Sequence, residues 1–320
     1  MPATPLLTAP NIIDDGEPRL KRVVSVSLGA STGDFKRELK LNGIDFTLSR
    51  VGCNADMELA ASTLEKLDGH VDAIGLGGID VYLRVAGDQF VIGDGLRLAQ
   101  HAKITPVVDG SGLKETLERT TVETLVNRGY IQRGTKVLMV SALDRFGMAE
   151  ALVAAGCECK FGDLIFNMKI DYPLTTLEEL KDLARKYRSR LLTVPFRMLY
   201  PTGAAQNERS ADGKFAHYYC EADVIAGDRH LILKHMPQDL HGKIILTNTT
   251  RPDTVDELRK AGARILATTT PDMDGVSAGT NVMEAAVVAL ADKPLSAITR
   301  DDYVEWSQRL KWQGEIHVLN

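Results

Sequence analysis

The chain has 320 residues, of which 44% are hydrophobic and 25% charged, a composition typical of globular proteins and unlike that of disordered, collagen-like or coiled-coil chains. It contains 38 lysines and arginines against 43 aspartates and glutamates, which gives a formal net charge of −5. No basic block is present that could follow a phosphate backbone, so we expect no nucleic acid partner. At roughly 100 to 200 residues per domain, this length predicts two domains.

The N-terminal segment, residues 1–20, carries four of the twelve prolines and predicts an extended arm. It lacks the basic and apolar regions of a signal peptide, and no later stretch approaches the roughly 18 apolar residues of a membrane helix. We therefore expect a cytoplasmic protein without a membrane partner. The four cysteines and seven histidines follow no disulfide or metal-binding spacing, and we favour reduced, buried thiols over a metal site.

After the arm, short β-branched runs alternate with helix-like stretches, as in βαβ units. In the first half we expect a helix at Met57 to Leu67 and strands at Val23 to Leu28, Phe46 to Val51, Ala73 to Leu76 and Thr105 to Val108. Two alternating segments around Ala86-Gly87-Asp88 predict a β-hairpin as well. The hairpin makes this half different from a plain repeat of βαβ units.

A polar stretch with two glycines, Arg128 to Lys136, predicts the boundary between the domains. Beyond it we expect strands within KVLMVSAL and CECKFGDLIF, and then at Leu191 to Val194, Asp223 to Ala226, Lys243 to Leu246 and Arg264 to Thr268. Capping-box pairs predict two helix starts, at Thr176 with Glu179 and at Thr254 with Glu257.

The predicted fold is α/β, with two domains that each contain a mainly parallel sheet flanked by helices, the second Rossmann-like. The predicted divisions are an arm at 1–20, a substrate-type domain with the hairpin at 21–132, a nucleotide-binding domain at 133–297, and a helix returning to the first domain at 298–320. Open parallel sheets often leave an edge free, so we also expect a homo-oligomer, with a dimer as the simplest form.

One segment predicts a strand, a loop and a helix, followed by a strand that ends near Asp163: VLMVSALDRFGMAEALVAAGCECKFGD. In dinucleotide folds the start of that helix faces the pyrophosphate, and such an acidic residue binds the ribose. The fingerprint G-x-G-x-x-G is reduced here to Gly147. Asp144 could cap the helix, and Arg145 could offset its charge. We predict that these four residues and Ser141 bind NAD or NADP, Asp163 favouring NAD, with an ordinary βα turn as the alternative.

A second candidate site follows the strand predicted at Thr105 to Val108. Asp109 ends the strand, and Ser111 and Lys114 open the next helix. Ligands of open α/β sheets bind at the carboxyl ends of the strands, where a lysine and an aspartate can move a proton to or from a hydroxyl or carbonyl group. We predict Lys114 and Asp109 as catalytic residues. The alternative is that Asp109 caps the helix and Lys114 is solvated.

Polar loops at other strand ends complete the predicted cleft. Substrate contacts are expected from residues at the ends of three strands: Ser27, Gly29, Ser31, Gly78, Asp80 and Ser111. Cofactor contacts are expected from threonine and asparagine clusters late in the chain: Thr249, Thr269, Thr280 and Asn281. Hairpin entry is the alternative for the glycines, and ordinary strand and helix capping for the threonines.

Six segments carry a resemblance to known proteins: VVSVSLG, VDAIGLGGID, TPVVDGSGLK, VLMVSALDRFGMAEAL, EADVIAGD and GTNVMEAA. They are similar to bacterial quinate or shikimate 5-dehydrogenase-like proteins and, more widely, to shikimate and methylenetetrahydrofolate dehydrogenases. The resemblance implies a substrate domain, a cleft and an NAD(P)-binding Rossmann domain. The shikimate dehydrogenase stretches N-V-T-x-P-H-K and N-T-D are absent, so Lys114 and Asp109 are assigned from position alone.

Two functions are compatible with these patterns. The first is an NAD(P)-dependent oxidoreductase that transfers hydride to or from a small hydroxy acid, keto acid or cyclitol, the protein orienting the cofactor and moving the proton. The second, favoured by the incomplete glycine loop, is a non-redox enzyme or binding protein for a nucleotide-bearing or phosphorylated metabolite. Both place a small molecule in the interdomain cleft.

Overall fold

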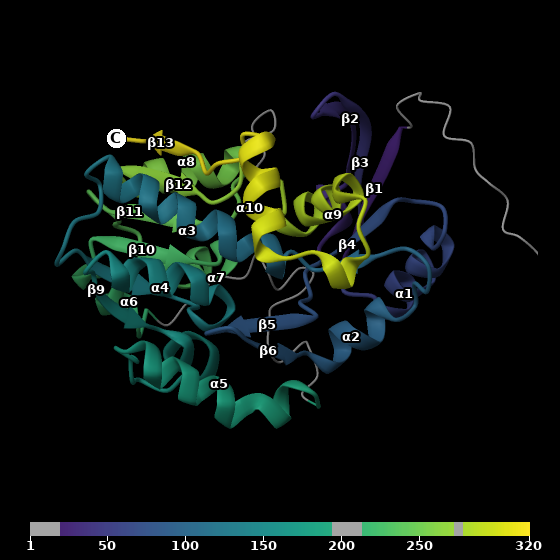
Figure 1. Cartoon of the computed structure of the whole chain (residues 1–320). Coiled ribbons are helices and arrows are strands. Elements are labelled where there is room, and N and C mark those ends of the chain that lie inside the picture. The colour runs from purple at the N-terminus through teal and green to yellow at the C-terminus, as the bar shows by residue number, and fades with distance from the viewer. Residues whose placement is uncertain (1–19, 194–212, 272–277) are drawn as a thin grey trace, which may run out of the picture.

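The computed structural model describes residues 20–193, 213–271 and 278–320, so nearly all of the predicted arm lies outside the described residues. Two open sheets with helices packed on them form two α/β domains (Figure 1), which confirms the predicted fold class. Among the residues described, no helix has both the length and the apolar character needed to span a membrane.

The first sheet has the strand order β2-β3-β1-β4-β7. Its strands are β1 (Lys21–Ser27), β2 (Phe35–Leu41), β3 (Ile44–Gly52), β4 (Ala73–Gly77) and β7 (Val107–Val108). All neighbours run parallel except β2, which pairs antiparallel with β3 at the edge. Sequence patterns missed β2 because it lies at the edge and its side chains alternate between half-buried and exposed, without a buried apolar run.

The second sheet has the strand order β13-β12-β11-β10-β8-β9. Its strands are β8 (Lys136–Met139), β9 (Glu158–Phe161), β10 (Val224–Gly227), β11 (Ile244–Thr247), β12 (Ile265–Thr268) and β13 (Ile316–Val318), the last antiparallel to β12. Numbered along the chain, its parallel strands run 2-1-3-4-5 and not in the Rossmann order 3-2-1-4-5-6, so that part of the prediction is wrong. The parallel strands of the first sheet run 2-1-3-4.

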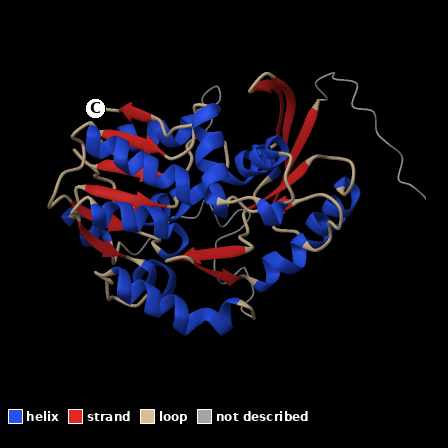
Figure 2. Ribbon diagram, in the orientation of Figure 1, coloured by secondary structure: helices blue, strands red, loops and turns tan. Residues whose placement is uncertain are grey.

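Helices cover both faces of the sheets (Figure 2). They are α1 (Met57–Leu67), α2 (Gly93–Ala99), α3 (Ser111–Asn127), α4 (Phe146–Ala154), α5 (Leu177–Leu191), α6 (Ala216–Glu221), α7 (Arg229–His235), α8 (Pro252–Lys260), α9 (Thr280–Ala291) and α10 (Arg300–Arg309). The capping box at Thr176 is confirmed. The one predicted at Thr254 is wrong because α8 begins at Pro252. The strand predicted from Leu191 is also wrong, since Leu191 ends α5 and the rest of that range reaches beyond the described residues.

The chain passes between the domains more than once. The first half of α3 packs in the core of the first domain and its second half in that of the second. The predicted hairpin is confirmed as β5 (Tyr82–Val85) and β6 (Asp88–Val91), and its apolar side chains join the core of the second domain. Late in the chain, α9 and α10 (yellow in Figure 1) return to the first domain, and β13 then joins the second sheet.

Helix α9 corrects the predicted domain division. It was placed with the second domain, within 133–297, but it packs directly on β1 and β4. The glycines of β4 make this close contact possible, because a side-chain carbon at Gly75 would lie 2.5 Å from the carbonyl oxygen of Asn281. A side-chain carbon at Gly110, which has a φ of 92°, would lie 2.7 Å from the amide nitrogen of Asn281. These glycines therefore accommodate the start of a helix.

Candidate functional site

A cavity of about 290 Å³ lies between the two domains. Its walls include the ends of β1 and β4 in the first domain and residues that follow β8 and β10 in the second. These are the points at which the strand order of each sheet reverses, where ligands of open α/β sheets bind. The ligand-binding edges of both sheets thus face one interdomain cavity.

Most of the predicted site residues line this cavity: Ser27, Gly29, Gly78, Asp80, Asp109, Lys114, Ser141, Asp144, Arg145, Thr249, Thr280 and Asn281. The others are not among its lining residues: Ser31, Ser111, Gly147, Asp163 and Thr269. Sequence reasoning thus located the edge at which the polar groups gather. The contacts that these groups make differ from those predicted.

Asp163, predicted to bind a ribose, has a different role. Its carboxylate is buried and accepts hydrogen bonds from the backbone amides of Ala142, at 3.0 Å, and Leu143, also at 3.0 Å. Burial raises the pKa of Asp163 to about 6, although these amides act in the opposite direction. The side chain therefore fixes the loop after β8 and is not directed at a ligand.

The remaining residues outside the cavity are explained by packing. The amide of Ser31 donates to Oδ1 of Asn54 at 2.8 Å, which closes a loop near the surface. Gly147 lets α4 approach α3, since a side-chain carbon there would come within 2.7 Å of a side chain on α3. Ser111 and Thr269 are buried. None of these contacts requires a cofactor.

Asp109 does not form the predicted pair with Lys114. Its Oδ2 accepts hydrogen bonds from the amides of Val81, at 2.7 Å, and Tyr82, at 2.8 Å, and its Oδ1 from that of Ser111, at 2.9 Å. The carboxylate ties the entry of the hairpin to the start of α3. Asp109 is thus a positioning residue, although it is not the cap of the helix, because the N-cap of α3 is Gly110.

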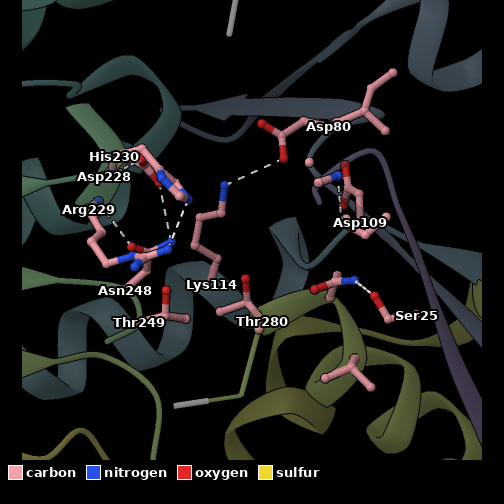
Figure 3. Close-up of a pocket in the computed structure, with 18 of the residues that line it drawn as sticks. Ser25, Asp80, Asp109, Lys114, Asp228, Arg229, His230, Asn248, Thr249 and Thr280 are labelled. Atoms are coloured by element: carbon pink, nitrogen blue, oxygen red, sulfur yellow. Dashed lines mark hydrogen bonds and ion pairs between the residues drawn. The ribbon is translucent and has the colours of Figure 1, made fainter. Parts of the chain in front are cut away.

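Lys114 lies in the middle of the cavity and points toward Asp80 (Figure 3). Its Nζ is 2.8 Å from Oδ1 of Asp144 and 3.8 Å from Oδ1 of Asp80. Burial alone would lower the pKa of Lys114, but the two carboxylates outweigh burial and raise it. The lysine is therefore charged at neutral pH, and the solvated alternative is wrong because its side chain is only 10% exposed.

The two carboxyl groups beside Lys114 differ in protonation. Burial raises the pKa of Asp80 to about 8, against the opposing charge of the lysine. The pKa of Asp144 lies at about 2, because the charges of Lys114 and Arg145 outweigh its burial. The opposite directions of the two pKa values favour a proton on Asp80 and an ionised Asp144 at neutral pH. The cluster thus connects three parts of the molecule, because Asp80 belongs to the first domain, Lys114 to α3 and Asp144 to the second domain.

Arg145 is also committed to protein contacts. It is buried, with Nη1 donating to Oε1 of Glu118 at 2.5 Å and Nη2 to Oδ2 of Asp228 at 3.2 Å. Its Nη2 lies a further 3.8 Å from Oδ2 of Asp144. This guanidinium is compensated by carboxylates on several sides, so it is poorly placed for the pyrophosphate for which it was predicted.

Three arginines that sequence reasoning missed line the cavity. Arg50 belongs to β3, Arg229 opens α7 and Arg251 precedes α8. Weak signals were present: Arg50 is a cation inside a strand with buried residues, and Arg251 directly follows the threonine cluster of Thr249. Asp228, His230 and Asn248 also line the cavity and lie close to Arg229 (Figure 3). In the described part of the chain, no cluster of three or more metal-ligating side chains is found.

Two family models match the chain, both described as domains of unknown function. DUF8753 matches residues 22–109 and DUF8754 matches residues 112–319. No curated protein matches the chain. The junction between the two matches falls at the start of α3, the helix shared by both domains.

Solved structures align over most of the chain at low similarity. A galactofuranose-binding protein is 12% identical over 91% of this chain and 98% of its own, with a TM-score of 0.36. The arabinose-binding component of an ABC transporter from Shewanella sp. ANA-3 is 11% identical over 91% and 96%, with a TM-score of 0.35. A solute-binding protein from Burkholderia multivorans is 9% identical over 94% and 99%, with a TM-score of 0.38.

The predicted membership of the quinate and shikimate dehydrogenases is wrong. Neither of the two matching family models describes a dehydrogenase; both describe domains of unknown function. The contacts in the site also differ from the prediction: the expected ribose ligand Asp163 holds a loop, and Lys114 is not paired with Asp109. The predicted function, a Rossmann oxidoreductase that transfers hydride, is therefore wrong as well.

Proposed function

For this chain, which belongs to the family of the domain of unknown function DUF8754, we propose that it binds a small, hydroxyl-rich metabolite in the cleft between its two domains. The cavity of about 290 Å³ lies near the lower end of the range for ligand pockets, which favours a compact ligand. Such a ligand would contact both sheets at once. No hydride transfer is part of this proposal.

The observation that carries the proposal is the cluster of Lys114, Asp80 and Asp144 in the cavity. It offers an ammonium donor, an ionised acceptor and a protonated carboxyl group within a few ångströms of one another. A hydroxyl group both donates and accepts, so neighbouring hydroxyls on a carbon chain match such alternating groups. Ser25 and Thr280 add hydroxyls to the wall near α9. The lining is therefore complementary to a polyol or sugar.

Thermal unfolding in the presence of candidate ligands tests this proposal. The panel contains neutral monosaccharides and polyols, sugar acids and sugar phosphates, with NAD and NADP for comparison. A ligand at a hundredfold its Kd adds ~2.7 kcal/mol to the free energy of unfolding, and we expect at least one hydroxylated compound to raise Tm by roughly 5 °C.

The variant Lys114→Met should remove that ligand-induced rise in Tm, measured from the variant's own baseline. Lys40→Met is the matched control, because Lys40 is an exposed lysine on β2 that does not line the cavity. The proposal fails if no hydroxylated compound raises Tm, or if both variants keep the rise.

A further inference from the structure

Two of the arginines meet across the cavity next to Gly33. A side-chain carbon at Gly33 would lie 3.0 Å from Nη2 of Arg251 and 3.2 Å from Nη1 of Arg50. Arg50 comes from β3 in the first domain, and Arg251 comes from the second domain just before α8. Two guanidinium groups therefore approach the same point from opposite sides of the cleft.

Arg229 is the third cation at this end and is almost fully buried, at 8% exposure. Its Nη1 donates to Oγ1 of Thr254 at 3.1 Å, and its Nη2 lies 3.1 Å from Nε2 of His230. Its Nε is buried without a hydrogen-bond partner in the described residues. A buried donor without an acceptor is unfavourable, and Arg229 is one of the residues that line the cavity.

The positive charge of this group is incompletely compensated. Within the described parts of the chain, Arg229 and Arg251 form no ion pair with a carboxylate, whereas Arg50 is paired with Oδ1 of Asp34 at 2.8 Å. The pKa of Arg229 is lowered by burial and by the charge of Arg251, which outweigh the opposing charges of Asp228 and Asp253. Burial also lowers the pKa of Arg50, which Asp34 opposes and Arg251 reinforces. An anion between these groups would relieve their mutual repulsion.

The arrangement favours a phosphate over a carboxylate. A carboxylate has two oxygens, which one guanidinium fork can already satisfy, whereas a phosphate monoester has three terminal oxygens and a second negative charge. Hydroxyls of Ser27 and Thr249 line the same cavity and add donors. We infer that Arg50, Arg229 and Arg251 form a subsite for a phosphate group, which the two domains bind together.

This inference rests on the proposed function and narrows its ligand to a phosphorylated, hydroxyl-rich metabolite. The phosphate lies at the three arginines and the hydroxyl-bearing body extends toward Lys114. Because the cations belong to both domains, the phosphate draws them together across the cleft. Binding therefore stabilises the contact between the domains as well as each domain.

Calorimetric titration with inorganic phosphate at constant ionic strength tests the subsite directly. We expect the natural protein to bind phosphate and Arg251→Gln to bind it at least tenfold more weakly. Arg259→Gln is the matched control, since Arg259 is an exposed arginine of α8, paired with Asp256 at 2.8 Å and absent from the cavity wall. The affinity of Arg259→Gln for phosphate should stay within twofold of that of the natural protein. The subsite is refuted if phosphate does not bind, or if both variants lose affinity equally.

A second titration separates this subsite from the proposed function. It compares glycerol phosphate, glycerate and glycerol, which share a short hydroxylated chain and differ in the charged group. We expect glycerol phosphate to bind most tightly, and Arg251→Gln to remove its advantage. Equal affinity for glycerate and glycerol phosphate would overturn the phosphate assignment while leaving the proposed function intact. Binding of inorganic phosphate together with failure of every hydroxylated compound would overturn the proposed function and leave the subsite standing.

Discussion

Asp80 is the residue of the cleft whose charge responds most directly to pH. Its folded pKa of about 8 compares with an ordinary value of 3.8. Between these values the unfolded chain has lost the proton that the folded protein keeps, so unfolding releases a proton and stability falls as the pH rises. Glu118 and Glu284, whose pKa values burial raises to about 7, act in the same direction. The folded protein is therefore expected to be more stable at pH 5 than at pH 8.

The variant Asp80→Asn should flatten this dependence, because the amide cannot ionise. One proton changes the slope of the free energy of unfolding by at most ~1.4 kcal/mol per pH unit. Urea unfolding at several pH values from 5 to 8 measures the slope, and Asp45→Asn, an exposed carboxyl on β3, serves as the control. Identical slopes for the natural protein and Asp80→Asn would contradict the assignment.

For single residues, the sequence predicts which side chains lie at the cavity better than it predicts which side chains contact one another. Asp80, Lys114 and Asp144 follow strands or open helices, so their arrival at one sheet edge could be predicted from chain order. Their mutual contacts could not, because Asp144 reaches Lys114 only through the relative placement of two domains. Arg229 was missed for the same reason, since its significance lies in its position in the folded cavity wall, where it forms no ion pair with a carboxylate of the described residues.

The packing of α9 on β4 is the element-scale contact that shapes the cleft. It positions Thr280 and Asn281 in the cavity wall, with Nδ2 of Asn281 donating to Oγ of Ser25 at 2.6 Å. The hairpin and the capping box at Thr176 could be predicted because their signals are local. Strand β13 could not, because it depends on a distant partner, β12.

Gly75→Ala tests the contact between α9 and β4. The added carbon would meet the backbone of Asn281, and overpacking of this kind costs about 2 to 3 kcal/mol. Gly134→Ala is the control: its position has open space but a φ of 82°, so it reports backbone strain alone, about 1 kcal/mol. Chemical denaturation should show the larger loss for Gly75→Ala, and an equal or smaller loss would argue against the tight contact.

The whole molecule is expected to unfold as one unit, although it has two sheets. Helix α3 contributes to both cores, the hairpin enters the second core, and β13 returns to the second sheet after α9 and α10 have packed on the first. The two tryptophans, Trp306 and Trp312, lie against the core of the first domain. Tryptophan fluorescence and far-UV circular dichroism should therefore give the same urea midpoint, and two separate midpoints would show independent domains.

The homo-oligomer expected from the sequence stays a prediction.

The return of α9 to the first domain also sets an order of events during synthesis. When residue 271 leaves the ribosome, all the parallel strands of the second sheet are present, whereas the face of the first sheet that carries Val23 and Phe46 still lacks α9. The earlier part of the chain must wait for the later part, the reverse of the usual N-terminal-first order. An apolar sheet face is thus left uncovered on the growing chain, and accessible to chaperones, until residues 280–309 emerge.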